Sequence, residues 1–161
     1  MRDGIVIRHA EGERDIRAVR ELFAEYQQWL GVDLCFQGFT EELDGLPGAY
    51  SAPTGCLLLA CEDDRYAGVI GIRPMAGDGK PDVCEMKRLF VRKPWRGNGV
   101  GRALSEAAMD WARRAGYGRI CLDTLEKLRE ARALYVSQGF REIEAYYDNP
   151  LEAPLYMERD L

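Results

Sequence analysis

The sequence predicts an α/β or α+β domain with a mixed sheet, because short apolar segments precede and interleave with amphipathic ones. Short apolar runs are typical of buried strands, and apolar residues spaced three or four apart are typical of helices. Glycines stand where the helical patterns stop. Since neither an internal repeat nor a linker divides the 161 residues, we expect residues 1–161 to fold as a single domain.

The first half of the chain contains patterns for strands, helices and a hairpin. A helix is indicated where Ile16, Val19, Phe23 and Tyr26 fall on one face and Gly31 follows as a stop. In chain order we expect a strand over 5–7, a helix over 15–30, a short helix over 39–46, and strands over 56–61 and 66–72 joined by a polar hairpin at 62–65. A loop rich in glycine and proline is expected over 77–82.

The second half repeats the alternation of strand and helix. Its helical patterns end at Gly116 and Gly139, which favours helix stops at both places. In chain order we expect a strand over 83–91, a helix over 99–115, a strand over 120–123, a helix over 128–138, and closing strands over 143–147 and 155–158.

The charge balance argues against two classes of partner. There are 22 Lys and Arg against 27 Asp and Glu, giving a net charge of −5. Such a chain lacks the positive field that nucleic acid binding usually needs. Its longest apolar run is far below the roughly 20 residues that span a bilayer, and its start lacks the apolar stretch of a signal peptide. We therefore expect a cytoplasmic protein with neither a nucleic acid nor a membrane partner.

Five cysteines and one histidine bear on redox state and metal binding. The cysteine number is odd, no C-x-x-C pair occurs, and four of the five lie in apolar runs that predict strands. Reduced core cysteines in a cytosolic protein are the simplest interpretation. With a single histidine and unsuitable spacings, the sequence predicts no metal site.

A glycine-rich segment between a predicted strand and a predicted helix carries the chemistry. It reads Arg96-Gly97-Asn98-Gly99-Val100-Gly101-Arg102, at the end of a stretch (87–102) that holds six cationic and no acidic residues. The free N–H groups of a helix N-terminus attract anions, and glycines let a bulky phosphate approach the backbone. The glycine spacing fits neither the Rossmann fingerprint nor the P-loop. By itself the segment is equally compatible with a plain helix start.

Three blocks in the correct order resemble the GCN5-related N-acetyltransferase (GNAT) superfamily. Residues 96–101 resemble its Arg/Gln-x-x-Gly-x-Gly/Ala loop, 85–91 its central strand, and 131–140 its late helix and following turn. The match is firm over about 84–140 and covers the first half by element order only. The resemblance implies a central, mixed, mostly antiparallel twisted sheet of six to seven strands flanked by about four helices.

The resemblance also implies an activity and assigns roles. Family members bind acetyl-CoA as cosubstrate, without a metal, and move its acetyl group to an amine that attacks the thioester directly. The loop 96–101 with Arg102 would bind the pyrophosphate. Leu89, Phe90 and Val91 would lie along the cosubstrate, with a backbone N–H of Val91 or Leu89 donating to the acetyl carbonyl.

Two side chains are candidates for proton transfer. Tyr135 matches the family's tyrosine near the thioester sulfur and would protonate the leaving thiolate, although a core aromatic is the simpler interpretation. Glu85 is a candidate base. The alternatives are that Glu85 only forms a salt bridge, or that an ordered water acts as the base. Leu128 departs from the family, because many relatives carry there an asparagine that bonds the pantetheine arm.

The acceptor itself stays open at this stage. A small-molecule amine and a protein amine both suit an acetyltransferase, and fold membership does not choose between them. Family members are often dimers, so a homodimer is one expectation. The alternative from another class is a non-catalytic acyl-CoA sensor or regulatory module.

Overall fold

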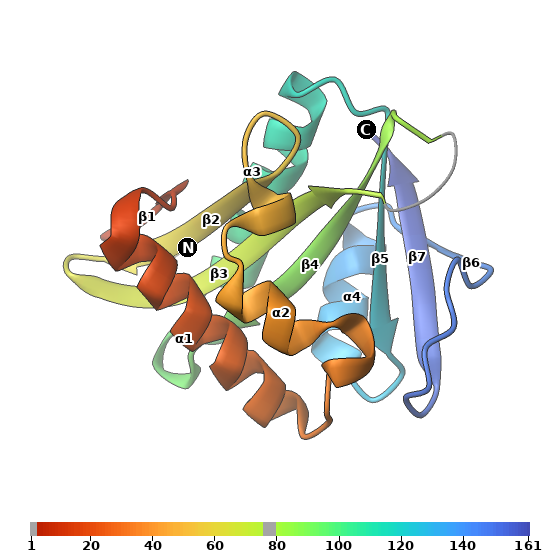
Figure 1. The fold of residues 1–161 in the computed structure, drawn as a ribbon, viewed down its shortest axis with the longest axis horizontal. Coiled ribbons are helices and arrows are strands. Elements are labelled where there is room, and N and C mark those ends of the chain that lie inside the picture. Colours follow the sequence, from red (N-terminus) through yellow and green to blue (C-terminus); the bar gives the residue numbers. More distant parts are fainter. Residues whose placement is uncertain (1–2, 76–79) are drawn as a thin grey trace.

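The computed structural model describes residues 3–75 and 80–161, apart from the side chain of Phe36. Residues 77–79 of the loop expected over 77–82 therefore lie outside the described residues. The described strands form one seven-stranded sheet in the order β1-β2-β3-β4-β5-β7-β6 (Figure 1). They are β1 Ile5–His9, β2 Cys56–Glu62, β3 Arg65–Pro74, β4 Val83–Val91, β5 Arg119–Leu125, β6 Arg141–Ile143 and β7 Pro154–Asp160. β4 and β5 pair in parallel, and the other neighbours pair antiparallel.

Helices cover both faces of this sheet. The α-helices are α1 Gly12–Leu30, α2 Phe39–Asp44, α3 Val100–Arg114 and α4 Arg129–Ser137, with short 3-10 turns η1 Cys35–Gln37, η2 Gly48–Tyr50 and η3 Lys93–Trp95. Figure 1 shows α1 and α2 on the near face and α3 and α4 behind the sheet. None of the helices in the described ranges is long and apolar enough to cross a membrane.

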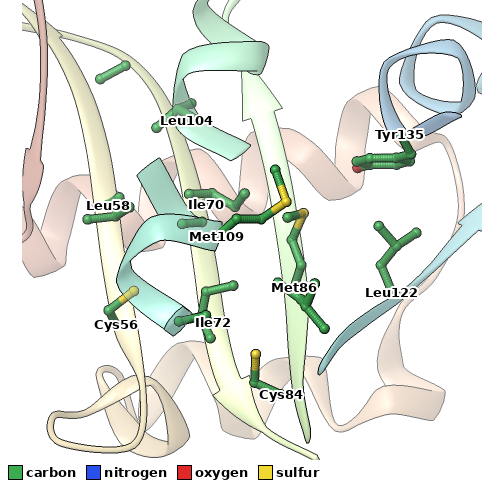
Figure 2. Close-up of a cluster of buried hydrophobic side chains, with 14 of the residues drawn as sticks. Cys56, Leu58, Ile70, Ile72, Cys84, Met86, Leu104, Met109, Leu122 and Tyr135 are labelled. Atoms are coloured by element: carbon green, nitrogen blue, oxygen red, sulfur yellow. The ribbon is translucent and has the colours of Figure 1, made fainter. Parts of the chain in front are cut away.

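The alternation of side chains along β2 shows why this strand is apolar throughout. Cys56, Leu58 and Ala60 belong to the core beneath α3, whereas Leu57 and Leu59 belong to the core beneath α1. Successive side chains of a strand point to opposite faces, so a strand covered on both sides has no solvent face. Figure 2 shows the α3-side core, where Ile70, Ile72 and Met86 of the neighbouring strands continue the same layer.

Most expected elements are present, with helix and strand ends shifted by a few residues. Gly31 and Gly139 end their helices with φ of 72° and 84°, in the left-handed region that glycine favours. The strand expected over 143–147 is wrong, since β6 ends at Ile143 and residues 144–147 are irregular. The hydroxyls of Tyr146 and Tyr147 donate to buried carboxylates of β4 and β5, which draws this segment away from strand pairing.

The centre of the sheet is irregular in two ways. The parallel pairing of β4 with β5 ends at Glu85 and Cys121, after which the strands diverge (Figure 1). On the other side, β3 and β4 pair Val69 with Phe90 and then Gly71 with Lys87. Ile70 thus faces both Arg88 and Leu89, a β-bulge, and Arg88 has a left-handed φ of 61°. The second half of β4 is consequently without a neighbour on its β5 side among the described residues.

Candidate active site

A long groove runs from the end of β4 past the glycine-rich loop to the start of α4. Its volume is about 530 Å³. The lining residues are Trp29, Leu89, Phe90, Val91, Trp95, Arg96, Gly97, Gly99, Val100, Gly101, Lys127, Leu128, Arg129, Glu130, Ala131 and Leu134. Three cationic side chains against one carboxylate give this lining a positive formal charge, which suits a polyanion.

The N-terminus of α3 supplies hydrogen-bond donors to the groove. Gly99 is the N-cap residue, with φ of 78°, and within the described residues no side chain caps the helix. The first bond from this turn runs from the Ala103 N–H to the Gly99 carbonyl, 3.0 Å. The earlier N–H groups of α3 therefore remain available to an anion, and the helix dipole adds partial positive charge there.

The two arginines of the loop region, Arg96 and Arg102, differ in their position relative to the groove. The Arg96 Nε donates to the Val91 carbonyl at 2.7 Å, and its guanidinium carbon lies 5.0 Å from the Trp29 ring centroid. Arg96 therefore belongs to the aromatic wall of the groove through a cation–π contact. Asn98 and Arg102 do not line this groove, and Arg102 instead donates to the Ser137 hydroxyl at 2.9 Å.

A smaller inner chamber of about 60 Å³ opens between the diverging strands. It shares Trp29, Leu89, Leu128 and Ala131 with the long groove, so the two spaces adjoin. The remaining lining residues are Tyr26, Leu30, Leu34, Gln37, Met86, Lys87, Arg88, Leu122, Asp123, Thr124, Leu125, Tyr135, Asn149 and Leu151. Leu128 occupies this junction, where many members of the resembled family carry an asparagine.

Tyr135 reaches the inner chamber from α4. Its ring packs edge-on against Phe140, with centroids 5.7 Å apart, and Figure 2 shows it beyond Met86 and Leu122 of the two diverging strands. Burial raises the pKa of its phenol above the usual value of about 10. In the part of the chain that the structure describes, no residue hydrogen-bonds this hydroxyl. The phenol is therefore protonated and available as a donor.

A buried ion pair joins β4 and β5 where their backbones have separated. Lys87 Nζ lies 3.1 Å from an Asp123 carboxylate oxygen and 3.2 Å from Gln37 Oε1. Tyr147 and Asn149 also donate to Asp123. Burial alone raises the pKa of Asp123, but the Lys87 ammonium and the hydrogen bonds from Tyr147 and Lys87 bring that pKa below its usual value. Asp123 is thus an ionised carboxylate in the wall of the inner chamber.

Glu85 occupies a different position. It is 4% exposed and sits where β4 and β5 still pair. Its carboxylate accepts hydrogen bonds from Arg73 at 2.9 Å and from the Tyr146 hydroxyl at 2.8 Å. Glu85 lines neither the groove nor the chamber. The structure therefore places Tyr135 and Leu89 in the wall of one chamber. It places Glu85 outside that wall, where the carboxylate accepts a hydrogen bond from Tyr146.

Sequence reasoning missed Lys87, Asp123 and Gln37 as wall residues of the chamber. The two charges were visible within largely apolar strands, Lys87 beside Glu85 and Arg88 at 83–91, and Asp123 at 119–125. Buried charges are uncommon unless they are paired, so each was a sign of an unseen partner. Within the described residues, no group of three or more His, Cys, Asp or Glu side chains is arranged to hold a metal.

Comparison with known proteins agrees with this geometry. Residues 16–140 match the model of the acetyltransferase (GNAT) family. An uncharacterized N-acetyltransferase of Schizosaccharomyces pombe is 36% identical, covering 92% of this chain and 90% of its own. An acetyltransferase structure from Streptococcus agalactiae has a TM-score of 0.77 at 25% identity, covering 99% of both chains. A Thermoplasma acidophilum N-acetyltransferase solved with coenzyme A has a TM-score of 0.75 at 18% identity, covering 98% of this chain and 99% of its own.

These matches extend over both halves of the sheet and both cavities. The family match includes the central strands, the glycine-rich loop and α4. The chain therefore belongs to the GNAT family and is an acetyl-CoA-dependent N-acetyltransferase.

Proposed function

We propose that this protein transfers the acetyl group of acetyl-CoA to a primary amine by direct attack within a ternary complex. The observation that carries the proposal is that two spaces share a wall. A cationic groove with free helix N–H groups adjoins a chamber that is lined by a protonated tyrosine and unpaired strand backbone. Holding both reactants beside these donors would turn a bimolecular reaction into an effectively unimolecular one.

The groove is the proposed site of the coenzyme A moiety. The N–H groups of Val100 and Gly101 at the start of α3 would bind the pyrophosphate. Arg96, Lys127 and Arg129 add positive charge along the same groove. At Gly97, with φ of 76°, no atom lies within 4 Å of where a Cβ would stand, so the backbone there is open to a large anion. Asn98 and Arg102 would act by shaping the loop and by long-range charge.

The diverging half of β4 supplies the proposed donors to the acetyl carbonyl. The Arg92 N–H bonds to the Ala67 carbonyl of β3 at 2.8 Å. Because successive N–H groups of a strand alternate sides, those of Val91 and Leu89 point toward β5, which is no longer within pairing distance. Either N–H would stabilise negative charge as it develops on the carbonyl oxygen.

Tyr135 is the proposed general acid. As the amine nitrogen bonds to the carbonyl carbon and the carbon–sulfur bond breaks, the Tyr135 hydroxyl would give its proton to the leaving thiolate. Its raised pKa keeps it protonated at neutral pH, as an acid must be before the step. Solvent would return the proton afterwards.

The proton of the attacking amine needs an acceptor. An alkylamine has a pKa of about 10.4, so most of it arrives protonated at neutral pH. Of the two carboxylates nearby, Asp123 lines the chamber, and Glu85 would act only through Tyr146 or water. We propose Asp123 as the group that receives or orients this proton, and Glu85 as the alternative. Comparing the rates of Asp123→Asn and Glu85→Gln separates them.

The chamber constrains the acceptor. A volume of about 60 Å³ holds only a few atoms, so the reacting amine would enter as a slender end. A small metabolite and a protein lysine both satisfy this requirement. A homodimer remains a proposal, which a sedimentation measurement would test.

The first experiment separates catalysis from sensing. Purified protein is incubated with acetyl-CoA and a panel of primary amines, and free thiol is followed, with acetyl-CoA and ADP binding measured in parallel. Amine-dependent thiol release with binding selective for acetyl-CoA supports the proposal. Selective binding without release would favour a non-catalytic acyl-CoA sensor, and equal binding of ADP would point to a general phosphate site.

A further inference from the structure

We infer that Glu42 of α2 and Arg88 of β4 form a buried clamp that fixes the bulge and thereby aims the Leu89 N–H into the inner chamber. The inference deepens the proposed function, because it assigns positioning residues to its backbone donor. Glu42 lies outside the segments that carried the family resemblance, and Arg88, within the segment 85–91, was assigned no role there.

The bulge places a residue in an unfavourable backbone conformation. Arg88 has φ of 61°, a region that side chains with a Cβ rarely adopt. Such a residue persists only where its surroundings over-determine it, and such residues cluster at functional sites. Here the strained residue directly precedes Leu89, which lines both the groove and the chamber.

The side chain of Arg88 is held on several sides. Its Nε and terminal nitrogen lie 3.1 and 3.3 Å from the two carboxylate oxygens of Glu42, a forked pair. Its guanidinium carbon also lies 5.0 Å from the Phe39 ring centroid. The side chains of Arg88 and Glu42 are only 3% and 10% exposed. A buried fork restricts orientation more tightly than a solvated ion pair.

Glu42 links the clamp to Arg73 and, through Arg73, to Glu85. A terminal nitrogen of Arg73 lies 3.5 Å from the same carboxylate, and Arg73 also pairs with Glu85. Among the described residues, the carboxylate that forms an ion pair with Arg88 is therefore Glu42, which is shared with a second cation and comes from the short helix α2. Loss of the Glu42 charge would leave the buried Arg88 without this ion pair, which favours a different side-chain and backbone arrangement.

The chain offers a matched control. Arg92, just beyond β4, makes the same kind of fork with Glu25 of α1, at 2.9 and 2.6 Å. That pair lines neither cavity, and Arg92 lies beyond the bulge. Glu25→Gln therefore removes a carboxylate from a more exposed fork, in which the Arg92 and Glu25 side chains are 26% and 38% exposed, without touching Arg88.

The test combines kinetics with a measurement on the Leu89 amide itself. In Glu42→Gln we expect kcat to fall about 10-fold while the KM for acetyl-CoA changes less than about 2-fold, since the donor acts mainly in the transition state. The ¹⁵N-labelled Leu89 amide should shift and exchange faster with solvent. In Glu25→Gln both properties should stay at their wild-type values. Urea unfolding of each variant confirms that folded protein is compared.

Arg88→Lys is the second variant, because it keeps the positive charge and removes the fork. It should move the Leu89 amide in the same direction, by less, and give a smaller loss of kcat. If folded Glu42→Gln or Arg88→Lys leaves the Leu89 amide unmoved and kcat unchanged, the clamp has no positioning role. A wild-type protein that releases no thiol with any amine would overturn the proposed function instead. In that case the shift and exchange of the Leu89 amide in the variants would still show whether the clamp fixes the bulge.

Discussion

The two faces of the sheet are filled by different kinds of side chain. Beneath α3 lie aliphatic and sulfur-containing residues such as Ile70, Met86 and Leu104. Beneath α1 and α2 an apolar layer borders six paired charges at the centre of the sheet, namely Glu42, Arg73, Glu85, Lys87, Arg88 and Asp123. Buried ion pairs contribute little net stability compared with apolar packing. The contrast indicates that the packed core beneath α3 mainly stabilises the fold, with Tyr135 at its border with the chamber, and that the charged side is retained for what it positions.

The largest expected effect tests the proposed acid. Tyr135→Phe removes one hydroxyl, which no described residue hydrogen-bonds, and keeps the ring packed on Phe140. We expect kcat to fall about 10²–10⁴-fold, the usual contribution of general acid catalysis. The free energy of unfolding should change little. Unchanged thiol release in the folded variant would remove Tyr135 from the mechanism.

The next test is directed at the charged face. Asp123→Asn leaves Lys87 buried without its closest carboxylate, which should lower the free energy of unfolding by about 3–5 kcal/mol. If Asp123 also handles the amine proton, kcat of the folded fraction should fall while Glu85→Gln retains more activity. Urea unfolding and steady-state kinetics are compared for the two variants. A larger kcat loss in Glu85→Gln would return the base role to Glu85.

On the opposite face we expect a stability effect alone. Leu104 is fully buried in α3 and lines neither cavity. Leu104→Ala should lower the free energy of unfolding by about 2–5 kcal/mol through lost burial and a residual cavity. At temperatures where the variant is folded, kcat and KM should match the wild type. A selective loss of kcat would show that the two faces are less separate than proposed.

The smallest effects should appear in the pH dependence. Because the folded pKa of Asp123 is depressed, its contribution to stability is present above its unfolded value of about 3.9 and is lost as pH falls through the folded pKa. Unfolding measured between pH 6 and 3 should therefore show an acid limb that is shallower in Asp123→Asn. The raised pKa of Tyr135 predicts that kcat shows no decline from this residue on the alkaline side up to about pH 10.

Local patterns were sufficient for most of the fold. Glycine stops, apolar periodicity and the polar hairpin depend on neighbours within a few residues, so they placed α1, α3, α4 and the first five strands. The closing strand over 143–147 was the exception. Tyr146 and Tyr147 have high strand propensity, but their hydroxyls bind Glu85 and Asp123 across the sheet, and this tertiary contact overrode the propensity.

The loop at 96–101, Leu89 and Tyr135 were recognisable because each lies within a contiguous motif. The charged partners were not, because Lys87 and Asp123 are 36 residues apart, and Glu42 and Arg88 are 46 apart. No local pattern encodes such a pair, since the role of a charged side chain in the interior depends on the partner that folding brings to it. The linear sequence thus specified the elements and the glycine-rich loop, whereas the divergence of β4 from β5, and the charges gathered around it, arose only when distant segments packed together.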